Sequence, residues 1–455
     1  MSRRYDAHGS VLDHSATGMS AAPVPRDPLH PARTAGPAHA APEETRWRLT
    51  WLGVPPLGLA AALAPVDPDL VFGFGLWLAG LALLGNGRLP RLGPLDHLAL
   101  LLCGWVTASL MWTRDAAASQ VAVQAWWTVA LLLVAARHVL TTRRRLLVVA
   151  GALLAGTVWT AVRIVLAGGT GEPAPRVGLD DMGVNHTSYA LTSGTLVCVM
   201  LLVARVGNRP VRAGLWTLFP LFVHATVLTG TSASLIALAA VAGYLLVTLA
   251  HRHAWAWSVV LSALLLVAVP FGHLTPYRPE WLDSVFNGPL DDLSGRLLVW
   301  PIAEASFWES PLVGIGAGAF PGINPYFGIG AHSLLLTLGN DVGLVGIAIF
   351  IAMITYVIRG AEPTSARRSA LLVGVLVVGW TPIWLTGHWE ISPLAWMVLA
   401  LWSRLPVALA PPPSGRRRRR RSAPPQLRRP TARGADGARS PAHLRVRPYE
   451  ARRMW

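Results

Sequence analysis

Two residues that could do chemistry, Arg296 and His332, lie in the longest polar interval of an otherwise apolar chain. Arg296 precedes an apolar and aromatic run, 297–308, that would lie along a membrane surface and place the guanidinium at headgroup depth. His332 lies where the chain becomes apolar again, and a half-desolvated imidazole that titrates near neutral pH suits a general base acting on a hydroxyl. The alternative is that His332 only anchors the end of a membrane span.

A glycine-rich sequence, GIGAGAF at 314–320, separates these two residues. Gly314 and Gly316 allow the backbone either to form a flexible re-entrant turn or to approach a ligand closely. The sequence is not a dinucleotide fingerprint because no βαβ unit surrounds it. It is not a phosphate-binding P-loop either, because no Gly-Lys-Ser/Thr follows.

The scaffold that must position these residues is a membrane protein. Of the 455 residues, 53% are hydrophobic and only 14% are charged, and long alternating polar and apolar segments are missing. Composition therefore predicts an all-α polytopic helix bundle, because a spanning helix needs roughly 20 apolar residues and an outer-membrane barrel needs alternation. We expect about twelve spans, near 49–66, 69–85, 96–112, 119–139, 146–167, 188–204, 211–228, 232–250, 254–270, 333–358, 369–387 and 391–410.

The arginines predict the orientation of the bundle. Arginine-containing loops at 88–91, 137–145, 205–212, 252 and 359–368 alternate along the chain and fall on the same side as both termini. By the positive-inside rule that side is the cytoplasm. The interval 271–332, between the ninth and tenth spans, is then one large extracytoplasmic loop of a multi-pass protein in the cell (inner or plasma) membrane.

Two tails flank the predicted transmembrane domain, 49–410. The segment 1–48 is rich in Pro, Ala and His, lacks the apolar core of a signal peptide, and is expected to be a disordered cytoplasmic tail. The segment 411–455 carries fourteen arginines and two carboxylates. We expect this basic, disordered cytoplasmic tail to bind anionic lipids and no nucleic acid.

The order of the motifs resembles that of the O-antigen ligase and polymerase superfamily. In that family an R…W pair, P-x-x-G-x-G and H-N-x-x-L…G-L-x-G follow one another. This chain has the same order: first Arg296 and Trp300, then ESPLVGIGAGAF, then AHSLLLTLGNDVGLVG. The resemblance covers roughly residues 180–350, extends to the dozen spans with one large outer loop, and departs mildly where Ser333 replaces the family Asn.

The resemblance implies a ligase-like enzyme that moves a glycan from undecaprenyl diphosphate to an acceptor hydroxyl on the outer face of the membrane, without metal or cofactor. Arg296 would hold the donor diphosphate through bidentate, charge-assisted bonds and stabilise it as the leaving group. His332 would deprotonate or orient the hydroxyl of a glycan or lipid acceptor. Ligase and polymerase both stay open, because they differ in acceptor rather than in donor chemistry.

One departure from the family pattern is larger. The family carries a Ser-Arg pair at the start of a span, whereas this chain reads LTGTSASLIAL, with Thr231 and Ser232 in those places. A hydroxyl cannot replace a guanidinium charge. Arg176 and Arg278, both in predicted outer loops, are therefore the candidates for the missing cation. If neither supplies it, this protein uses a different donor or has lost activity.

Two further pairs of polar residues lie near predicted span ends. Asn185 and His186, in GVNHTSYAL, look like the family's entry to the sixth span, and they either line the site or are solvated. Asn340 and Asp341 lie in the tenth span, where a buried carboxylate needs a partner. This pair either lines the donor cavity or holds neighbouring helices together.

Two other classes of protein compete with a transferase. Twelve spans with cytoplasmic ends also describe a secondary transporter or lipid flippase, but a transporter of the major facilitator type needs a long central cytoplasmic loop. Here the connection between the sixth and seventh spans, about 205–210, is short. A non-catalytic membrane scaffold is the remaining interpretation.

Overall fold

The computed structural model describes residues 51–87, 90–168, 177–179, 182–250, 296–326, 328–360, 366–387 and 389–409. Both predicted tails, the predicted span at 254–270 and most of the predicted outer loop lie outside these residues. Arg176, Arg278 and the side chain of Arg296 also lie outside the described part of the chain.

Within the described residues all regular structure is helical, as the composition predicts, and no strand occurs. The helices are α2 (Val54–Leu63), α3 (Pro68–Gly85), α4 (Pro94–Ala108), the short 3-10 helix η1 (Ser109–Met111), α5 (Ala116–Val139), α6 (Arg143–Gly168), α7 (Gly183–Val203), α8 (Arg209–Thr229), α9 (Ser232–Ala250), α12 (Arg296–Glu309), α13 (Phe320–Ile323), α14 (Leu334–Gly360), α15 (Ala366–Thr386) and α16 (Pro393–Leu409). Helices thus occupy the predicted spans that fall within the described residues.

Seven of the described helices are long and apolar enough to cross a membrane, and three shorter helices are also apolar. Their outer faces carry large apolar side chains, among them Trp77 and Leu84 of α3, which are 74% and 78% exposed. Such side chains suit contact with lipid. The count of twelve spans and the orientation of the bundle stay predictions.

Local sequence signals set where the helices begin and end. Asp67 and Asp115 cap α3 and α5, because each carboxylate accepts a hydrogen bond from the backbone N–H three residues later. Gly230 ends α8 in the left-handed conformation, with φ 59°, that glycine adopts without steric cost.

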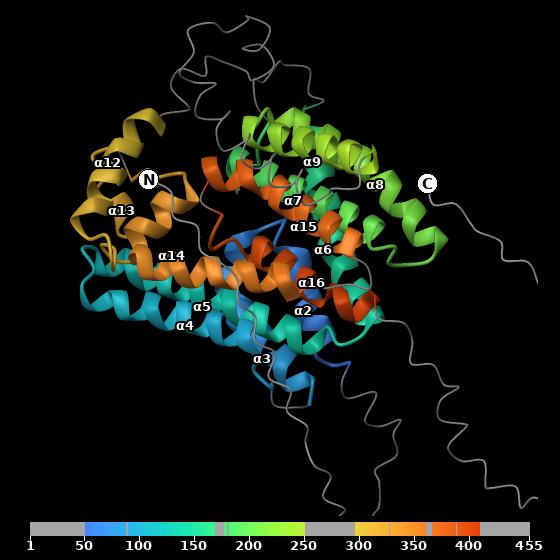
Figure 1. Cartoon of the computed structure of the whole chain (residues 1–455), viewed down its shortest axis with the longest axis horizontal. Coiled ribbons are helices and arrows are strands. Elements are labelled where there is room, and N and C mark those ends of the chain that lie inside the picture. Colours follow the sequence, from blue (N-terminus) through green and yellow to red (C-terminus); the bar gives the residue numbers. More distant parts are fainter. Residues whose placement is uncertain are drawn as a thin grey trace, which may run out of the picture.

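The helices form one bundle. Of the seven long apolar helices, α7 is the most enclosed, since 83% of the residues in its most apolar stretch are buried. The helix pairs α3 and α5, α9 and α15, α2 and α6, and α7 and α8 pack most extensively. Figure 1 shows α12 and α13 gathered at one end of this bundle, beside the beginning of α14. The short helices and the helix ends at this place carry the residues singled out by the sequence.

Candidate functional site

Helix α14 is interrupted at Gly343. The backbone there adopts φ 65° and ψ −169°, which is not helical, although helix continues on both sides. A break inside a membrane helix frees backbone N–H and C=O groups, and these must find partners in the protein because the bilayer core offers none. The span predicted at 333–358 is therefore built from two half-helices.

The glycine-rich segment and α4 supply these partners. The backbone N–H of Ile315 donates to the carbonyl oxygen of Asn340 at 2.6 Å. The indole N–H of Trp105 in α4 donates to the carbonyl oxygen of Val342 at 2.9 Å. Pairing of this kind lets non-helical backbone persist at membrane depth, and discontinuous helices of this type commonly line binding sites.

Close backbone contact explains two of the glycines. Gly314 and Gly343 both have positive φ, at 73° and 65°. A Cβ on Gly314 would lie 2.5 Å from the carbonyl oxygen of Asn340, and a Cβ on Gly343 would overlap the carbonyl group of Leu312. The glycine-rich segment can therefore reach the break only where side chains are missing.

Gly316 also lies in a close contact that leaves no room for a side chain, here against Thr113. Its φ is 112°, and a Cβ there would overlap Thr113 in the connection between α4 and α5. The backbone N–H of Arg114 also donates to the carbonyl oxygen of Ile315 at 3.1 Å. The structure thus places Gly314 and Gly316, the predicted substrate-binding glycines, against protein backbone and side chains, and neither lines the pocket beside the break.

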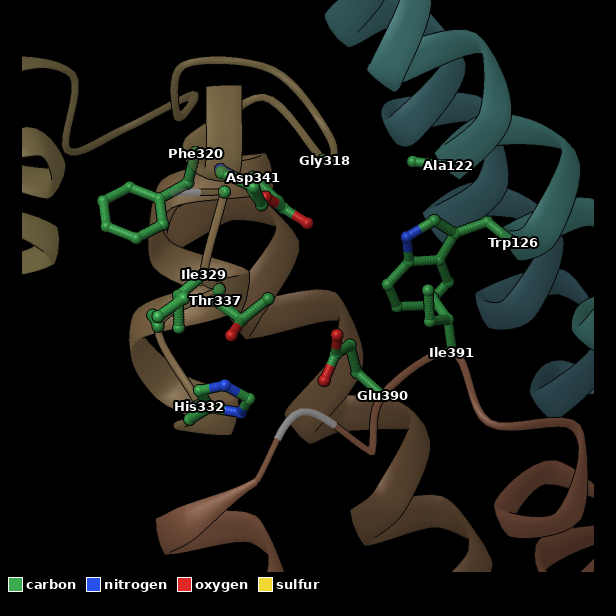
Figure 2. A pocket seen from close by; sticks show the side chains of 14 residues that line it. Ala122, Trp126, Gly318, Phe320, Ile329, His332, Thr337, Asp341, Glu390 and Ile391 are labelled. Carbon is green, nitrogen blue, oxygen red and sulfur yellow. The ribbon is translucent and has the colours of Figure 1, made fainter. Parts of the chain in front are cut away.

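That pocket has a volume of about 390 Å³. Its polar lining consists of His332 from the loop before α14, Thr337 and Asp341 from α14, and Glu390 from the loop between α15 and α16. Trp126 of α5 faces these residues from the other side (Figure 2). Groups from three distant parts of the sequence therefore converge on one space.

Asn340 and Asp341 have different surroundings, although they are neighbours at the break. The side-chain amide of Asn340 donates to the carbonyl oxygens of Ala303 at 2.9 Å and Leu336 at 2.8 Å, which ties α12 to α14. Asp341 instead lines the pocket, 6% exposed, and its carboxylate accepts a hydrogen bond from the backbone N–H of Gly318. Asn340 holds helices together, whereas Asp341 belongs to the cavity.

Glu390 was not among the residues singled out by the sequence. It is 4% exposed, and its Oε2 atom has no hydrogen-bond partner among the described residues. Burial raises the pKa of the Glu390 carboxyl to about 8, and the negative charge of Asp341 acts in the same direction. Glu390 is therefore mostly protonated at neutral pH and has a hydrogen to donate. The signal that could have found it is a lone acidic residue in the apolar sequence GHWEIS.

His332 is held by its neighbours in a defined position. Its φ of 47° is uncommon for a residue with a side chain. The indole N–H of Trp300 in α12 donates to the carbonyl oxygen of Ala331 at 2.9 Å, which fixes the peptide before the histidine. Figure 2 shows the ring of His332 and the carboxyl of Glu390 pointing toward one another across the pocket.

Arg296 begins α12, one helical turn before Trp300. The four residues from Arg296 to Trp300 rise about 6 Å along the helix axis, so the backbone of Arg296 lies near the loop that carries His332. The motif order R…W then H thus has a geometric basis, because the tryptophan links the two elements.

Asn185 and His186 lie in the first turn of α7, half-buried, and neither lines the pocket. The ring of His186 lies 5.8 Å from the ring of Trp389, the residue before Glu390. The predicted second pair of site residues thus contacts the loop that carries Glu390 rather than the cavity itself.

Ser232, which stands in the place of the family arginine, begins α9. This helix packs against α15 and does not line the pocket. Among the described residues no arginine lines the pocket, and no group of three His, Cys, Asp or Glu residues is arranged to hold a metal ion.

Comparison with known families agrees with the motif order. Residues 216–351 match the family model described as O-antigen ligase, a range that contains most of α8, all of α9, α12 and α13, and the broken part of α14. This match supports the membership of the chain in the O-antigen ligase superfamily, and the prediction made from the motifs is confirmed. No curated protein and no solved structure matches the chain. The match to this family and the apolar helices together indicate a multi-pass membrane protein that transfers or ligates glycans.

Proposed function

We propose that this protein transfers a glycan from undecaprenyl diphosphate to an acceptor hydroxyl at the outer face of the membrane, as a ligase or polymerase in the synthesis of cell-surface polysaccharide. The observation that supports this most is the pocket beside the broken helix α14, where His332 faces Glu390. An imidazole beside buried carboxyl groups is suited to proton transfer from a hydroxyl.

The lining of the pocket favours the acceptor over the donor diphosphate. Asp341 and Glu390 would repel a diphosphate if ionised, and no described arginine lies among the lining residues to offset them. Sugar hydroxyls, in contrast, pair well with carboxyl oxygens. The hydroxyl of Thr337 and Oε2 of Glu390 are buried without a partner among the described residues, and buried polar atoms of this kind normally have one.

Transfer then proceeds in one balanced step. The acceptor oxygen attacks the anomeric carbon, the new oxygen–carbon bond forms, and the bond from that carbon to the diphosphate oxygen breaks. The electron pair leaves with the diphosphate, while the proton of the acceptor hydroxyl passes to His332 and from there to the departing diphosphate or to water. A carboxylate at Asp341 would stabilise the imidazolium that forms.

The donor diphosphate is assigned to the outer-loop side of the pocket. Arg296, at the beginning of α12, is the residue proposed to hold it through bidentate charge-assisted bonds. Because Ser232 lacks the charge of the family arginine, Arg176 or Arg278 would supply the second cation. The assignment of Asn185 and His186 to the substrate site rests on the contact of His186 with Trp389.

The test uses a strain that lacks the gene and is complemented with His332→Ala or Arg296→Ala. We expect both variants to reproduce the deletion, with altered surface glycan and accumulated undecaprenyl-linked intermediates, at normal amounts of protein in the membrane. His97→Ala and Arg209→Ala, at exposed positions in α4 and α8, are the matched controls and should restore the glycan. The proposal fails if both site variants restore normal glycan amount and chain length. Unchanged glycans with altered uptake of a solute would favour a transporter.

A further inference from the structure

A second pocket, of about 190 Å³, lies toward the other end of α5. Arg91, Arg137, His138 and Arg404 line it together with one carboxylate, Asp96. Arg137 comes about three helical turns after Trp126, the residue of α5 that lines the first pocket. The second pocket is therefore separate from the candidate transfer site, and an inference about it does not rest on the proposed function.

The charges in this pocket do not balance. Both oxygens of Asp96 are occupied, because Oδ1 accepts from Nη1 of Arg137 and Oδ2 accepts from the backbone N–H of Gly93, each at 2.7 Å. The single buried carboxylate thus offsets the charge of Arg137. The guanidinium groups of Arg91 and Arg404 remain as excess positive charge around the cavity.

These arginines also retain hydrogen-bond donors. Arg91 makes no ion pair or side-chain hydrogen bond with any described residue, and Arg404 uses its Nε to donate to the carbonyl oxygen of Leu140 at 3.2 Å. Nε of Arg137 is buried without a partner among the described residues. Planar guanidinium groups with unpaired N–H donors bind phosphate oxygens in a bidentate manner.

His138 fixes the geometry of the cluster. One ring nitrogen lies 2.8 Å from the carbonyl oxygen of Val134 and the other lies 3.0 Å from the carbonyl oxygen of Arg91. A carbonyl oxygen only accepts, so a ring nitrogen that carries a hydrogen donates to the carbonyl oxygen it faces. The histidine thereby links the loop of Arg91 to the end of α5.

We infer that this pocket binds a phosphate group, either the headgroup of an anionic lipid or a soluble phosphate. Leu92, the next residue after Arg91, is 39% exposed and is an apolar side chain that an acyl chain would contact. The predicted orientation places this end of α5 at the cytoplasmic leaflet, where basic pockets between helices bind anionic headgroups. A bound phosphate would join the loop before α4 to the ends of α5 and α16 through Arg91, Arg137 and Arg404.

The test measures lipid binding by the full-length protein. The protein is placed in nanodiscs of phosphatidylcholine with or without phosphatidylglycerol, and retained lipid is counted by native mass spectrometry while unfolding is followed by heating. We expect retained phosphatidylglycerol and a higher Tm for the wild-type protein, since a ligand that binds only the folded state stabilises it. Arg91→Gln and Arg404→Gln should each weaken this binding about tenfold.

A matched control and a second ligand separate the outcomes. Arg209→Gln removes an exposed arginine of α8 that does not line the pocket and should leave binding unchanged. Inorganic phosphate added to phosphatidylcholine nanodiscs identifies a soluble ligand if it alone gives the rise in Tm. Arg91 makes no side-chain hydrogen bond or ion pair with a described residue, so the inference is overturned if Arg91→Gln binds both ligands as the wild-type protein does. It is equally overturned if the wild-type protein responds to neither ligand.

Discussion

The backbone N–H of Ile315 donates a hydrogen bond of 2.6 Å to the carbonyl oxygen of Asn340. In an uninterrupted helix this oxygen would accept from Leu344, whose N–H instead donates to the carbonyl oxygen of Pro311 at 2.9 Å. The glycine-rich segment therefore replaces helical bonding at the break in α14. The same break leaves Asp341 in the pocket.

The first prediction concerns the tight contact at this break. Gly343→Ala should lower the free energy of unfolding, because a left-handed backbone costs a residue with a Cβ about 1–2 kcal/mol and the Cβ would also overlap Leu312. The measurement is the Tm of the purified protein in detergent. Gly151→Ala, in α6 with open space around it, is the control and should leave the Tm equal or slightly higher. Equal Tm values for Gly343→Ala and the wild-type protein would contradict the contact.

The second prediction separates Asn340 from Asp341. Asn340→Ala loses the two side-chain hydrogen bonds to the carbonyl oxygens of Ala303 and Leu336 and should lower the free energy of unfolding by about 1–3 kcal/mol, since each such bond is worth about 0.5–1.5 kcal/mol. Asp341→Asn retains shape and should keep the Tm while glycan transfer falls. Transfer by purified protein and thermal unfolding are measured together. The assignment is wrong if Asp341→Asn transfers glycan at the wild-type rate.

How much of the site the sequence predicts depends on how local each signal is. The motif order predicts that Arg296 and Trp300 lie near His332, and in the structure Trp300 of α12 donates a hydrogen bond to Ala331, the residue before the histidine. The role of Gly314 is less accessible to sequence reasoning. A glycine that contacts protein backbone and a glycine that contacts a ligand look the same in a sequence, since both need only a missing Cβ.

The break at Gly343 and the part played by Glu390 follow from contacts between distant segments. GNDVGLVG reads as the beginning of an apolar span, because one glycine in a helix costs only about 1 kcal/mol relative to alanine. Only the segment near Ile315 turns that position into a break. Glu390 joins His332 because of the way the loop between α15 and α16 packs against α14, which local patterns do not encode.

The third prediction tests Trp300 as a positioning residue. Trp300→Phe keeps an aromatic ring but removes the bond from Nε1 to Ala331, so the peptide before His332 is no longer fixed. We expect kcat for glycan transfer to fall about tenfold with little change in KM, which is the pattern for an interaction that matters in the transition state. Trp308→Phe, 66% exposed on the same helix, is the control. An unchanged kcat for Trp300→Phe would remove the proposed link between α12 and the histidine.

The last prediction is a pH dependence that comes from Glu390. Burial raises the pKa of this carboxyl from 4.5 to about 8, so at intermediate pH the folded protein retains a proton that the unfolded chain has lost. The free energy of unfolding must therefore decrease as the pH rises through this interval, and above it the group adds no further change. Glu390→Gln cannot ionise, so its Tm should fall less steeply than that of the wild-type protein between about pH 5 and about pH 8.

Glu309→Gln provides the control for this measurement, because Glu309 is 53% exposed and pairs with Arg114 at the surface. Its Tm should follow the wild-type curve, since an exposed ion pair is worth little. Parallel curves for Glu390→Gln and the wild-type protein would mean that Glu390 is not buried in its neutral form. A flatter curve for Glu390→Gln would instead show that the pocket beside His332 holds a carboxyl group that can donate a hydrogen bond at neutral pH.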